Sequence, residues 1–235
     1  MYAETPLPGG TLWCSRGAAS ALIPADGCAD VILRGDDVLV AGPSTRSLTT
    51  LPDDGAGALG FRFTPGTARG LLRIDLSEIT DQLLPLDDVL GRRGTASLRA
   101  RLQRARAAWP AVSSPIAPPV AQEWSAHVHQ HARLATPAHL VASDRGWPER
   151  TFRRQVSAAF GYGYATLVRL ERAHRAQTLL RAGAPLADAA ARAGYADQPH
   201  LSREFRRVVG VSPRQFAGSA AKRSTELPSG SSSVA

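Results

Sequence analysis

The sequence has few of the residues and segments on which several classes of protein depend. Two cysteines, Cys14 and Cys28, are too few for a disulfide framework, so the expected location is a reducing cytoplasm. No run of about 18 apolar residues is present, so we expect no transmembrane helix and no membrane partner. The first residues, MYAETPLPGG, lack a basic segment followed by an apolar core and do not resemble a signal peptide.

Lysine is almost absent, and Lys222 is the only one in a chain of 235 residues with a net charge of +8. Residues 1–110 contain 12 Arg and 12 Asp or Glu, whereas residues 111–235 contain 16 Lys or Arg and 8 Asp or Glu. The whole positive excess therefore lies in the second half. This asymmetry is typical of a neutral domain joined to one that binds a polyanion, although a solvated basic face is the alternative.

Catalytic motifs are also missing, because the chain contains no GxSxG, P-loop, HExxH or Rossmann fingerprint. Asp26, Asp30, Asp36 and Asp37 are candidates for paired carboxylates, but they flank predicted turns. We therefore predict no enzymatic activity, no catalytic residue and no cofactor.

The first half of the chain is predicted to be α+β. Residues 11–64 contain short apolar runs separated by Gly, Asp and Pro, which is typical of strands, with a hairpin at 31–40 around Arg34-Gly35-Asp36. Beyond residue 66 the pattern favours short helices, with Ser77 as an N-cap. Residues 95–109 form a clear helical pattern, with Leu98, Leu102 and Ala105 on one face.

These patterns divide the chain into four segments. Residues 1–109 form the α+β domain, and residues 110–119, with four prolines and no charge, form an extended linker. Residues 120–217 form an all-α domain. Residues 218–235 are small and polar, so we expect a disordered tail.

The helical domain contains an internal repeat. Residues 152–161, FRRQVSAAFG, align with residues 201–210, LSREFRRVVG, at a shift of 49. Upstream, Ala142 and Gly146 correspond to Ala190 and Gly194, and an aromatic residue follows each glycine. A small residue, a glycine with positive φ and an amphipathic second helix together predict a helix-turn-helix. The chain is thus predicted to contain two such units, joined by a long helix at 164–183 with Leu167, Leu170, Ala173 and Leu180 along one stripe.

The second helix of each unit is predicted to bury one face and to expose arginines on the other. Positions i, i+4 and i+8 are apolar in both helices, and the opposite faces carry Arg150, Arg153 and Arg154, or Pro199, Ser202, Arg203 and Arg206. An α-helix fits the major groove of B-DNA, where Arg binds guanine O6 and N7 with two hydrogen bonds. Two units in one chain predict contacts with successive major-groove segments about 34 Å apart.

Residues 187–216, ADAAARAGYADQPHLSREFRRVVGVSPRQF, closely resemble the second motif of AraC/XylS-type transcriptional regulators. Residues 151–180 are similar to the first recognition helix and linker helix of that family, and the resemblance covers roughly residues 120–217. It implies a transcriptional regulator that binds double-stranded DNA and acts with RNA polymerase. The first unit departs from the family pattern, because Asp144 and Arg145 stand where an aliphatic residue is common, and we expect this unit to pack less firmly.

The resemblance also implies roles for side chains in the recognition helices. The positions that read bases in the family are Arg150, Arg153, Arg154, Gln198, Pro199, His200, Ser202 and Arg203. Pro199 has no hydrogen-bond donor and is expected to start its helix. The positions expected to contact the DNA backbone are Thr151, Gln155, Arg206 and Arg207. A phosphate contact remains the alternative for each arginine.

The N-terminal half resembles a short, poorly characterised domain found on some AraC-like regulators, on the basis of residues 23–33, 40–47 and 60–72. This second resemblance implies little chemistry, but the resemblance to AraC/XylS-type regulators implies that a domain in this place senses a small molecule, mediates self-association as a homodimer, or both. Trp13, Cys28, Arg46 and Arg62 are the candidates for an effector or sensing site, although each has a structural role as its alternative.

Two further interpretations stay open at this stage. In HVHQH, residues 127–131, His127 and His131 share a helical face and two such histidines can bind zinc, but no third ligand is evident nearby. We therefore expect packing or solvent exposure and predict no metal. The competing functional class is an interaction module whose first domain binds a partner protein, with an enzyme fused to a DNA-binding domain ranked third. The operator, the effector, the direction of regulation and the oligomeric state do not follow from the sequence.

Overall fold

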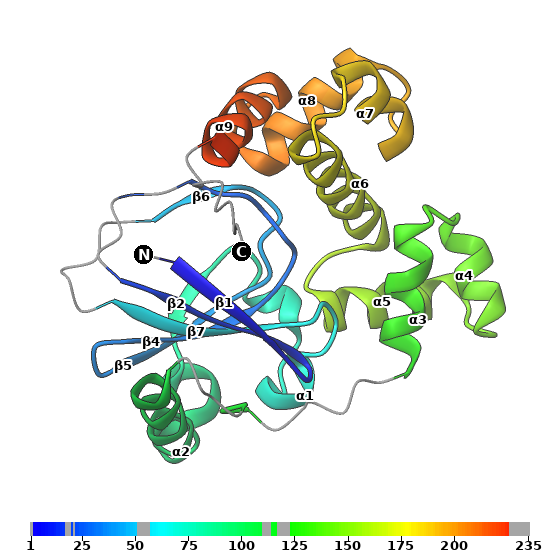
Figure 1. The fold of residues 1–235 in the computed structure, drawn as a ribbon. Helices are drawn as coiled ribbons and strands as arrows, with labels where there is room; N and C mark the ends of the chain where they lie inside the picture. Colours follow the sequence, from blue (N-terminus) through cyan, green and yellow to red (C-terminus); the bar gives the residue numbers. More distant parts are fainter. Residues whose placement is uncertain are drawn as a thin grey trace, which may run out of the picture.

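The computed structural model of the protein describes residues 2–16, 20, 22–50, 57–109, 114–116 and 123–225. The N-terminal half is built on a six-stranded sheet with the order β1-β2-β7-β4-β5-β8, in which all neighbours are antiparallel (Figure 1). The strands of this sheet are β1 (Tyr2–Leu7), β2 (Gly10–Ser15), β4 (Asp30–Arg34), β5 (Asp37–Ala41), β7 (Ala58–Phe63) and β8 (Leu83–Pro85). A separate two-stranded ribbon pairs β3 (Leu22–Ile23) with β6 (Leu48–Thr49).

The two faces of the large sheet differ in chemistry because the side chains alternate along each strand. One face carries Leu12, Val31, Val40 and Phe61, all of them fully buried, and packs against α2 (Asp87–Ala108). The other face carries Trp13 and charged side chains. Gly60 is required on this second face, since the indole of Trp13 lies only 2.2 Å from where a Cβ at position 60 would be.

Several local predictions for this half are confirmed and one is wrong. Residues 31–40 form a hairpin in which Arg34 pairs with Asp37, and Leu98, Leu102 and Ala105 are the buried face of α2. Ser77 is not an N-cap, because the carboxylate of Asp75 caps the 3-10 helix η1 (Leu76–Glu78) and accepts the Ser77 N–H. A short helix, α1 (Arg69–Leu72), precedes η1.

The C-terminal half is helical. Its helices are α3 (Glu123–Arg133), α4 (Ala138–Asp144), α5 (Glu149–Phe160), α6 (Tyr164–Arg181), α7 (Leu186–Ala193), α8 (Gln198–Val209) and α9 (Pro213–Thr225). They enclose a second hydrophobic core, separate from the core under the sheet. The predicted order of an α+β half followed by an all-α half is thus confirmed.

The predicted linker and tail lie largely outside the described residues. Within residues 110–119, Ile116 is 1% exposed and belongs to the core of the first half, so the chain is packed at this point. Helix α9 continues to Thr225 and enters the stretch for which the sequence predicts disorder. Alanine favours helix strongly, and Ala217 lies just before that stretch.

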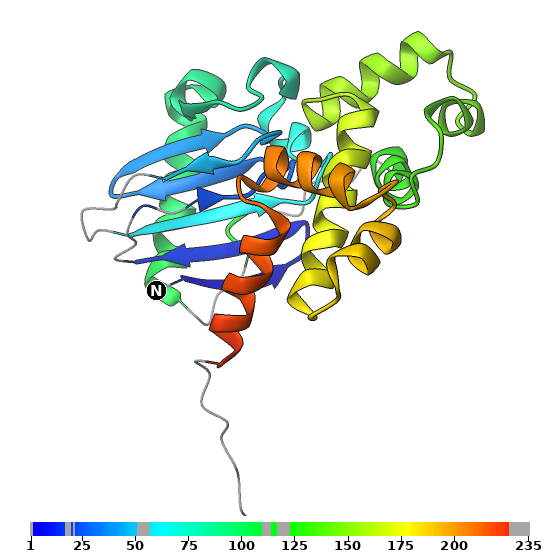
Figure 2. The same cartoon turned by 90° about the horizontal axis from the view of Figure 1, so that it is seen from above.

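The two halves pack directly on each other, with α8 and α9 on the side of the sheet opposite α2 (Figures 1 and 2). Ala25 is part of the C-terminal core, and its N–H donates to the carbonyl of Val208 at 2.9 Å. The hydroxyl of Tyr162 donates to the carbonyl of Gly27 at 3.0 Å. The N-terminal loop around residues 25–27 is therefore inserted into the helical half. Among the described residues, no helix is both long and apolar enough to span a bilayer.

Candidate nucleic-acid interface

Two helix-turn-helix units are present, α4–α5 and α7–α8, and their turns are made in the same way. The Trp147 N–H donates to the Ala142 carbonyl, and the Tyr195 N–H donates to the Ala190 carbonyl, both at 2.9 Å. The glycine before each aromatic residue is left-handed, with φ of 63° at Gly146 and 86° at Gly194. The repeat found in the sequence is thus a repeat in the structure.

The second helix of each unit separates an apolar face from a basic face. The apolar face is buried in both helices and consists of Phe152, Val156 and Phe160 in α5, and Leu201, Phe205 and Val209 in α8. The exposed side chains on the other face include Arg150, Arg153 and Arg154 in α5, and Arg203, Arg206 and Arg207 in α8. This arrangement places three exposed guanidinium groups on each helix, as the spacing predicts.

The remaining candidate side chains lie near the N-terminal ends of the same helices. Gln198 and Pro199 are exposed, whereas His200, Ser202, Thr151 and Gln155 are half-buried. Asp197 caps α8 by accepting the His200 N–H at 2.6 Å, and Pro199 lies in the first turn, as expected. The ring of His200 packs against Tyr195 and its Nδ1 accepts the Ala196 N–H at 3.4 Å. Only Nε2 of His200 is therefore left for a contact outside the chain.

Helix α6 connects the two units and is held by ion pairs to α8 and to α3. The predicted stripe of Leu167, Leu170, Ala173 and Leu180 is buried. Arg169 of α6 forms an ion pair with Glu204 of α8 at 2.9 Å, and Glu171 pairs with His129 of α3 at 2.7 Å. Burial raises the pKa of Glu171, but the hydrogen bond and charge of His129 outweigh it and hold that pKa below its ordinary value.

Residues 141–219 match the family model of a helix-turn-helix domain, and residues 11–85 match that of a domain of unknown function (DUF6597). The helical half is an AraC-type helix-turn-helix domain. The resemblance stated from the sequence is thereby confirmed, and the chain is a DNA-binding transcriptional regulator. None of the curated proteins is similar enough to this chain to count as a relative.

Several solved structures of DNA-binding regulators are similar to this chain. The DNA-binding domain of AdpA, solved in complex with a target DNA, is 23% identical, with a TM-score of 0.40, over 45% of this chain and 96% of that one. The C-terminal domain of AraT, a response regulator from Geobacillus stearothermophilus, is 22% identical, with a TM-score of 0.37, over 47% of this chain and 91% of that one. ToxT from Vibrio cholerae is 10% identical, with a TM-score of 0.43, over 93% of this chain and 97% of that one.

Outside the AraC-type domain, the second face of the sheet holds a compact charge cluster centred on Arg62. The Arg62 guanidinium contacts the carboxylates of Asp26 at 3.0 Å, Asp30 at 3.3 Å and Glu4 at 3.7 Å. Three carboxylates surround one cation, so the cluster carries an excess of negative charge when all of them are ionised. Trp13 lies on the same face, and Tyr2 stacks on its ring.

Burial changes the acid–base properties of this cluster. Burial raises the pKa of Asp30 to about 6, and the neighbouring Arg62 only partly opposes the shift. For Arg62, burial lowers the pKa, but the carboxylates of Asp30 and Asp26 outweigh this effect and raise it above its ordinary value. Arg62 therefore stays charged, whereas Asp30 changes charge in the physiological range.

The four sensing candidates from the sequence do not all come together. Trp13, Cys28 and Arg62 lie around the charge cluster, but Arg46 is 74% exposed and pairs with Asp81 at 3.8 Å instead. Burial, followed by the charges of Asp26 and Asp30, raises the pKa of the Cys28 thiol well above its ordinary value. The thiolate that a redox or electrophile sensor needs is therefore disfavoured at Cys28.

Sequence reasoning missed the partners of Arg62. It treated Asp26 and Asp30 together with Asp36 and Asp37, but Asp36 lies at the hairpin turn and contacts Gln103 instead. Asp30 and Arg62 come together through strand register, because they are direct partners in the pairing of β4 with β7. Glu4 was missed because the N-terminal strand was not predicted.

Proposed function

We propose that this protein binds its promoter by placing α5 and α8 in two successive major-groove segments, and that the N-terminal domain controls this binding. The observation that carries the proposal is the shared construction of the two units, each with a buried apolar face and three exposed arginines on its second helix. Helices of this kind fit the major groove, and their exposed side chains reach base edges. The protein acts on transcription through DNA, with RNA polymerase as its expected partner, and not through catalysis.

Specific contacts are assigned to the exposed faces of α5 and α8. The residues proposed to read bases are Arg150, Arg153, Arg154, Gln198, Pro199, His200, Ser202 and Arg203. The residues proposed to bind the DNA backbone are Thr151, Gln155, Arg206 and Arg207. Their half-buried or exposed positions support this assignment. Arg206 and Arg207 lie in the last turn of α8, near the end that contacts the N-terminal domain, but their side chains are exposed.

The N-terminal domain contacts the C-terminal end of each recognition helix. At α5, the hydroxyl of Thr80 donates to the carbonyl of Gly161 at 2.6 Å. At α8, Gly210 lies against Ser47 and Leu22, and the Val208 carbonyl accepts from Ala25. A single domain that holds both helix ends would set the distance and angle between the two base-reading surfaces.

The charge cluster centred on Arg62 adjoins these contacts through Asp26. Asp26 pairs with Arg62 and is the neighbour of Ala25 and Gly27, which contact the AraC-type domain. A small molecule that displaces a carboxylate from Arg62, or a second copy of the chain that binds the sheet face around Trp13, would move this loop. Either event would change how well both helices fit DNA at the same time.

The test is selection of genomic DNA fragments by the full chain at two salt concentrations, followed by binding measurements on the motif recovered. We expect two half-sites about 10 bp apart. Arg203→Ala should weaken binding to this motif by about 1–3 kcal/mol and relax the preference at one base pair. Arg206→Ala should weaken binding to all sequences alike and reduce the salt dependence.

Arg104→Ala is the matched control, because Arg104 is exposed on α2, on the far side of the sheet from α8. It removes the same charge and should leave DNA binding unchanged. Equal weakening of every sequence by Arg203→Ala would make Arg203 a phosphate contact. Recovery of fragments without a common motif would contradict the proposal of tandem base reading.

A further inference from the structure

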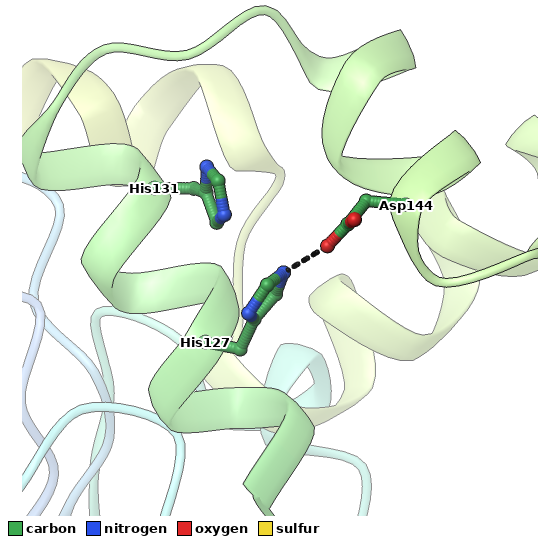
Figure 3. A group of neighbouring side chains, drawn as sticks. All are labelled: His127, His131 and Asp144. Carbon is green, nitrogen blue, oxygen red and sulfur yellow. Dashed lines mark ion pairs between the residues drawn. The ribbon is translucent and has the colours of Figure 1, made fainter.

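Two histidines of α3 lie close to one carboxylate of α4, the first helix of the first helix-turn-helix unit (Figure 3). His127 and His131 lie one turn apart with ring centroids 4.4 Å from each other, and Asp144 faces them from the last residue of α4. One potential ligand atom from each of the three residues lies within 4.8 Å of the other two. We propose that these three side chains bind a divalent transition metal ion of the zinc type, which ties α3 to the turn of the first unit.

The donor set fits this class of ion. Imidazole nitrogens with one carboxylate oxygen suit Zn²⁺ and its neighbours, whereas Mg²⁺ and Ca²⁺ prefer oxygen alone. Three protein ligands leave one tetrahedral position for water. The site is open to solvent, because the side chains of His127 and Asp144 are 30% and 60% exposed, so the ion can enter without unfolding of the domain.

The contact between His127 and Asp144 favours a bound cation over a simple hydrogen bond. The buried Nε2 of His127 lies 2.9 Å from the Asp144 carboxylate, yet it has no partner in hydrogen-bond geometry within the described residues. A nitrogen lone pair and a carboxylate oxygen that approach in this way can both coordinate one ion. The same ion would satisfy the buried nitrogen.

The ring of His131 is also held in an orientation that suits a metal ligand. Its Nδ1 lies 3.1 Å from the hydroxyl of Thr136, which leaves Nε2 as the ligand atom. A second hydrogen bond of this kind fixes the tautomer and orientation of metal-binding histidines. Thr136 is itself held, because the hydroxyl of Tyr164 donates to its carbonyl at 2.9 Å.

The first helix of the first unit is less well packed than that of the second unit. Helix α4 buries only Val141 and Ala142 among its described side chains. In the second unit, α7 buries Ala189, Ala190 and Ala193. Arg145 stands where the second unit has the buried Ala193, so a metal ion held between α3 and Asp144 would add a link beside a position at which α4 lacks apolar packing.

The experiment is a calorimetric titration of the untagged, chelator-treated full chain with Zn²⁺ alone. We expect one ion to bind per chain. His127→Gln, His131→Gln and Asp144→Asn should each lower the affinity by at least about tenfold, and Thr136→Val should lower it by a similar factor through His131. Failure of the wild-type chain to bind Zn²⁺, or equal binding by these variants, would overturn the proposal.

Two histidines provide matched controls. His129 belongs to the same HVHQH motif but pairs with Glu171, and His139 is exposed on α4 itself. His129→Gln and His139→Gln should bind Zn²⁺ like the wild type. If either weakens binding as much as His127→Gln, the ion is held elsewhere and the assignment is wrong.

Amide hydrogen exchange tests the proposed link to α4 without any use of DNA, so it is independent of the proposed function. Zn²⁺ should slow exchange in α4, whereas α7, the equivalent helix of the second unit, serves as the internal control and should not change. Equal slowing in both helices would mean that the ion stabilises the domain as a whole and does not tie α3 to α4.

Discussion

The fold disfavours the ionised form of Asp30 even though the guanidinium of Arg62 contacts its carboxylate. Its side chain is 14% exposed and contacts Arg62, but Arg62 also contacts Asp26 and Glu4. One guanidinium is thus shared among three carboxylates, and the cost of burial exceeds the attraction that remains for Asp30. The pKa of about 6 follows from this balance.

Because the pKa of Asp30 is raised in the folded state, ionisation of this residue destabilises the fold. The cost is absent well below the unfolded value of 3.8 and develops as the pH rises through the folded value of about 6. Asp30→Asn removes this cost. Relative to the wild type, this variant should have a larger free energy of unfolding in urea, and the gain should be about 2 kcal/mol greater at about pH 7.5 than at about pH 4.5.

Asp37→Asn is the matched substitution, since Asp37 is exposed at the turn of the same hairpin. A gain at pH 7.5 equal to that of Asp30→Asn would show that Asp30 is not its source. A loss of stability in Asp30→Asn at pH 7.5 would show that the ion pair with Arg62 outweighs burial.

The sequence predicted residues of this cluster only from their residue types and not from the partners that they contact. The sequence suggested Trp13, Arg46 and Arg62 as pocket residues and Cys28 as a separate candidate for sensing, and the structure places all of them except Arg46 around one cluster. The partners of Arg62 follow from strand register and from β1, neither of which is encoded by local pattern. Arg46 has the same residue type as Arg62 but lies at Asp81, which shows the limit of such reasoning.

The recognition helices α5 and α8 begin in different ways although their faces are alike. Asp197 caps α8 with its carboxylate, whereas α5 follows Pro148 and has no side-chain cap. A capping side chain satisfies one of the free N–H groups in the first turn. The start of α8 is therefore fixed by a local interaction, and the start of α5 relies on packing.

Asp197→Ala should lower the free energy of unfolding by about 1 kcal/mol, because the His200 N–H loses its acceptor. Asp197→Asn keeps an oxygen at this position and should retain most of the stability. Urea unfolding of the full chain at neutral pH measures both values. An equal loss in the two variants would mean that the charge of Asp197, and not the cap, stabilises α8.

Helices with a strong apolar periodicity were predictable from the sequence, whereas the strands at the two edges of the sheet were not. Helices 95–109, 152–160 and 201–209 follow from apolar spacing, which burial in a core enforces. Strands β1 and β8 form the two edges of the sheet and contain Pro6 and Pro85. Proline is tolerated at sheet edges, and β1 has no fully buried side chain, so neither strand shows an apolar alternation.

At the scale of the whole molecule, the two halves have separate cores that share one loop. Ala25 reaches into the helical core, and hydrogen bonds join Ala25 to Val208, Gly27 to Tyr162, and Thr80 to Gly161. These contacts lie at the C-terminal ends of α5 and α8, on the side away from the residues proposed to read DNA. Such an arrangement could not be predicted from the sequence, because the contacts join segments far apart in the chain without any shared local pattern.

If the N-terminal domain sets the distance between the recognition helices, it also sets the spacing of half-sites that the protein accepts. The double variant Thr80→Val/Tyr162→Phe removes two hydrogen-bond donors from this contact and keeps its shape. Each bond is worth about 1 kcal/mol, so the preference for the natural spacing over one altered by a base pair should fall by up to about thirtyfold. Binding measurements on operators with natural and altered spacing give this ratio.

The control is Tyr164→Phe/Thr178→Val, which removes the same groups from contacts that lie within the helical half. This variant should keep the spacing preference of the wild type, even where its stability is lower. If both double variants retain the preference, α6 alone holds the recognition helices in register, since Arg169 and Glu204 join it to α8. The N-terminal domain would then act on transcription without changing how the helices fit DNA, and its control would have to pass through a second subunit or RNA polymerase.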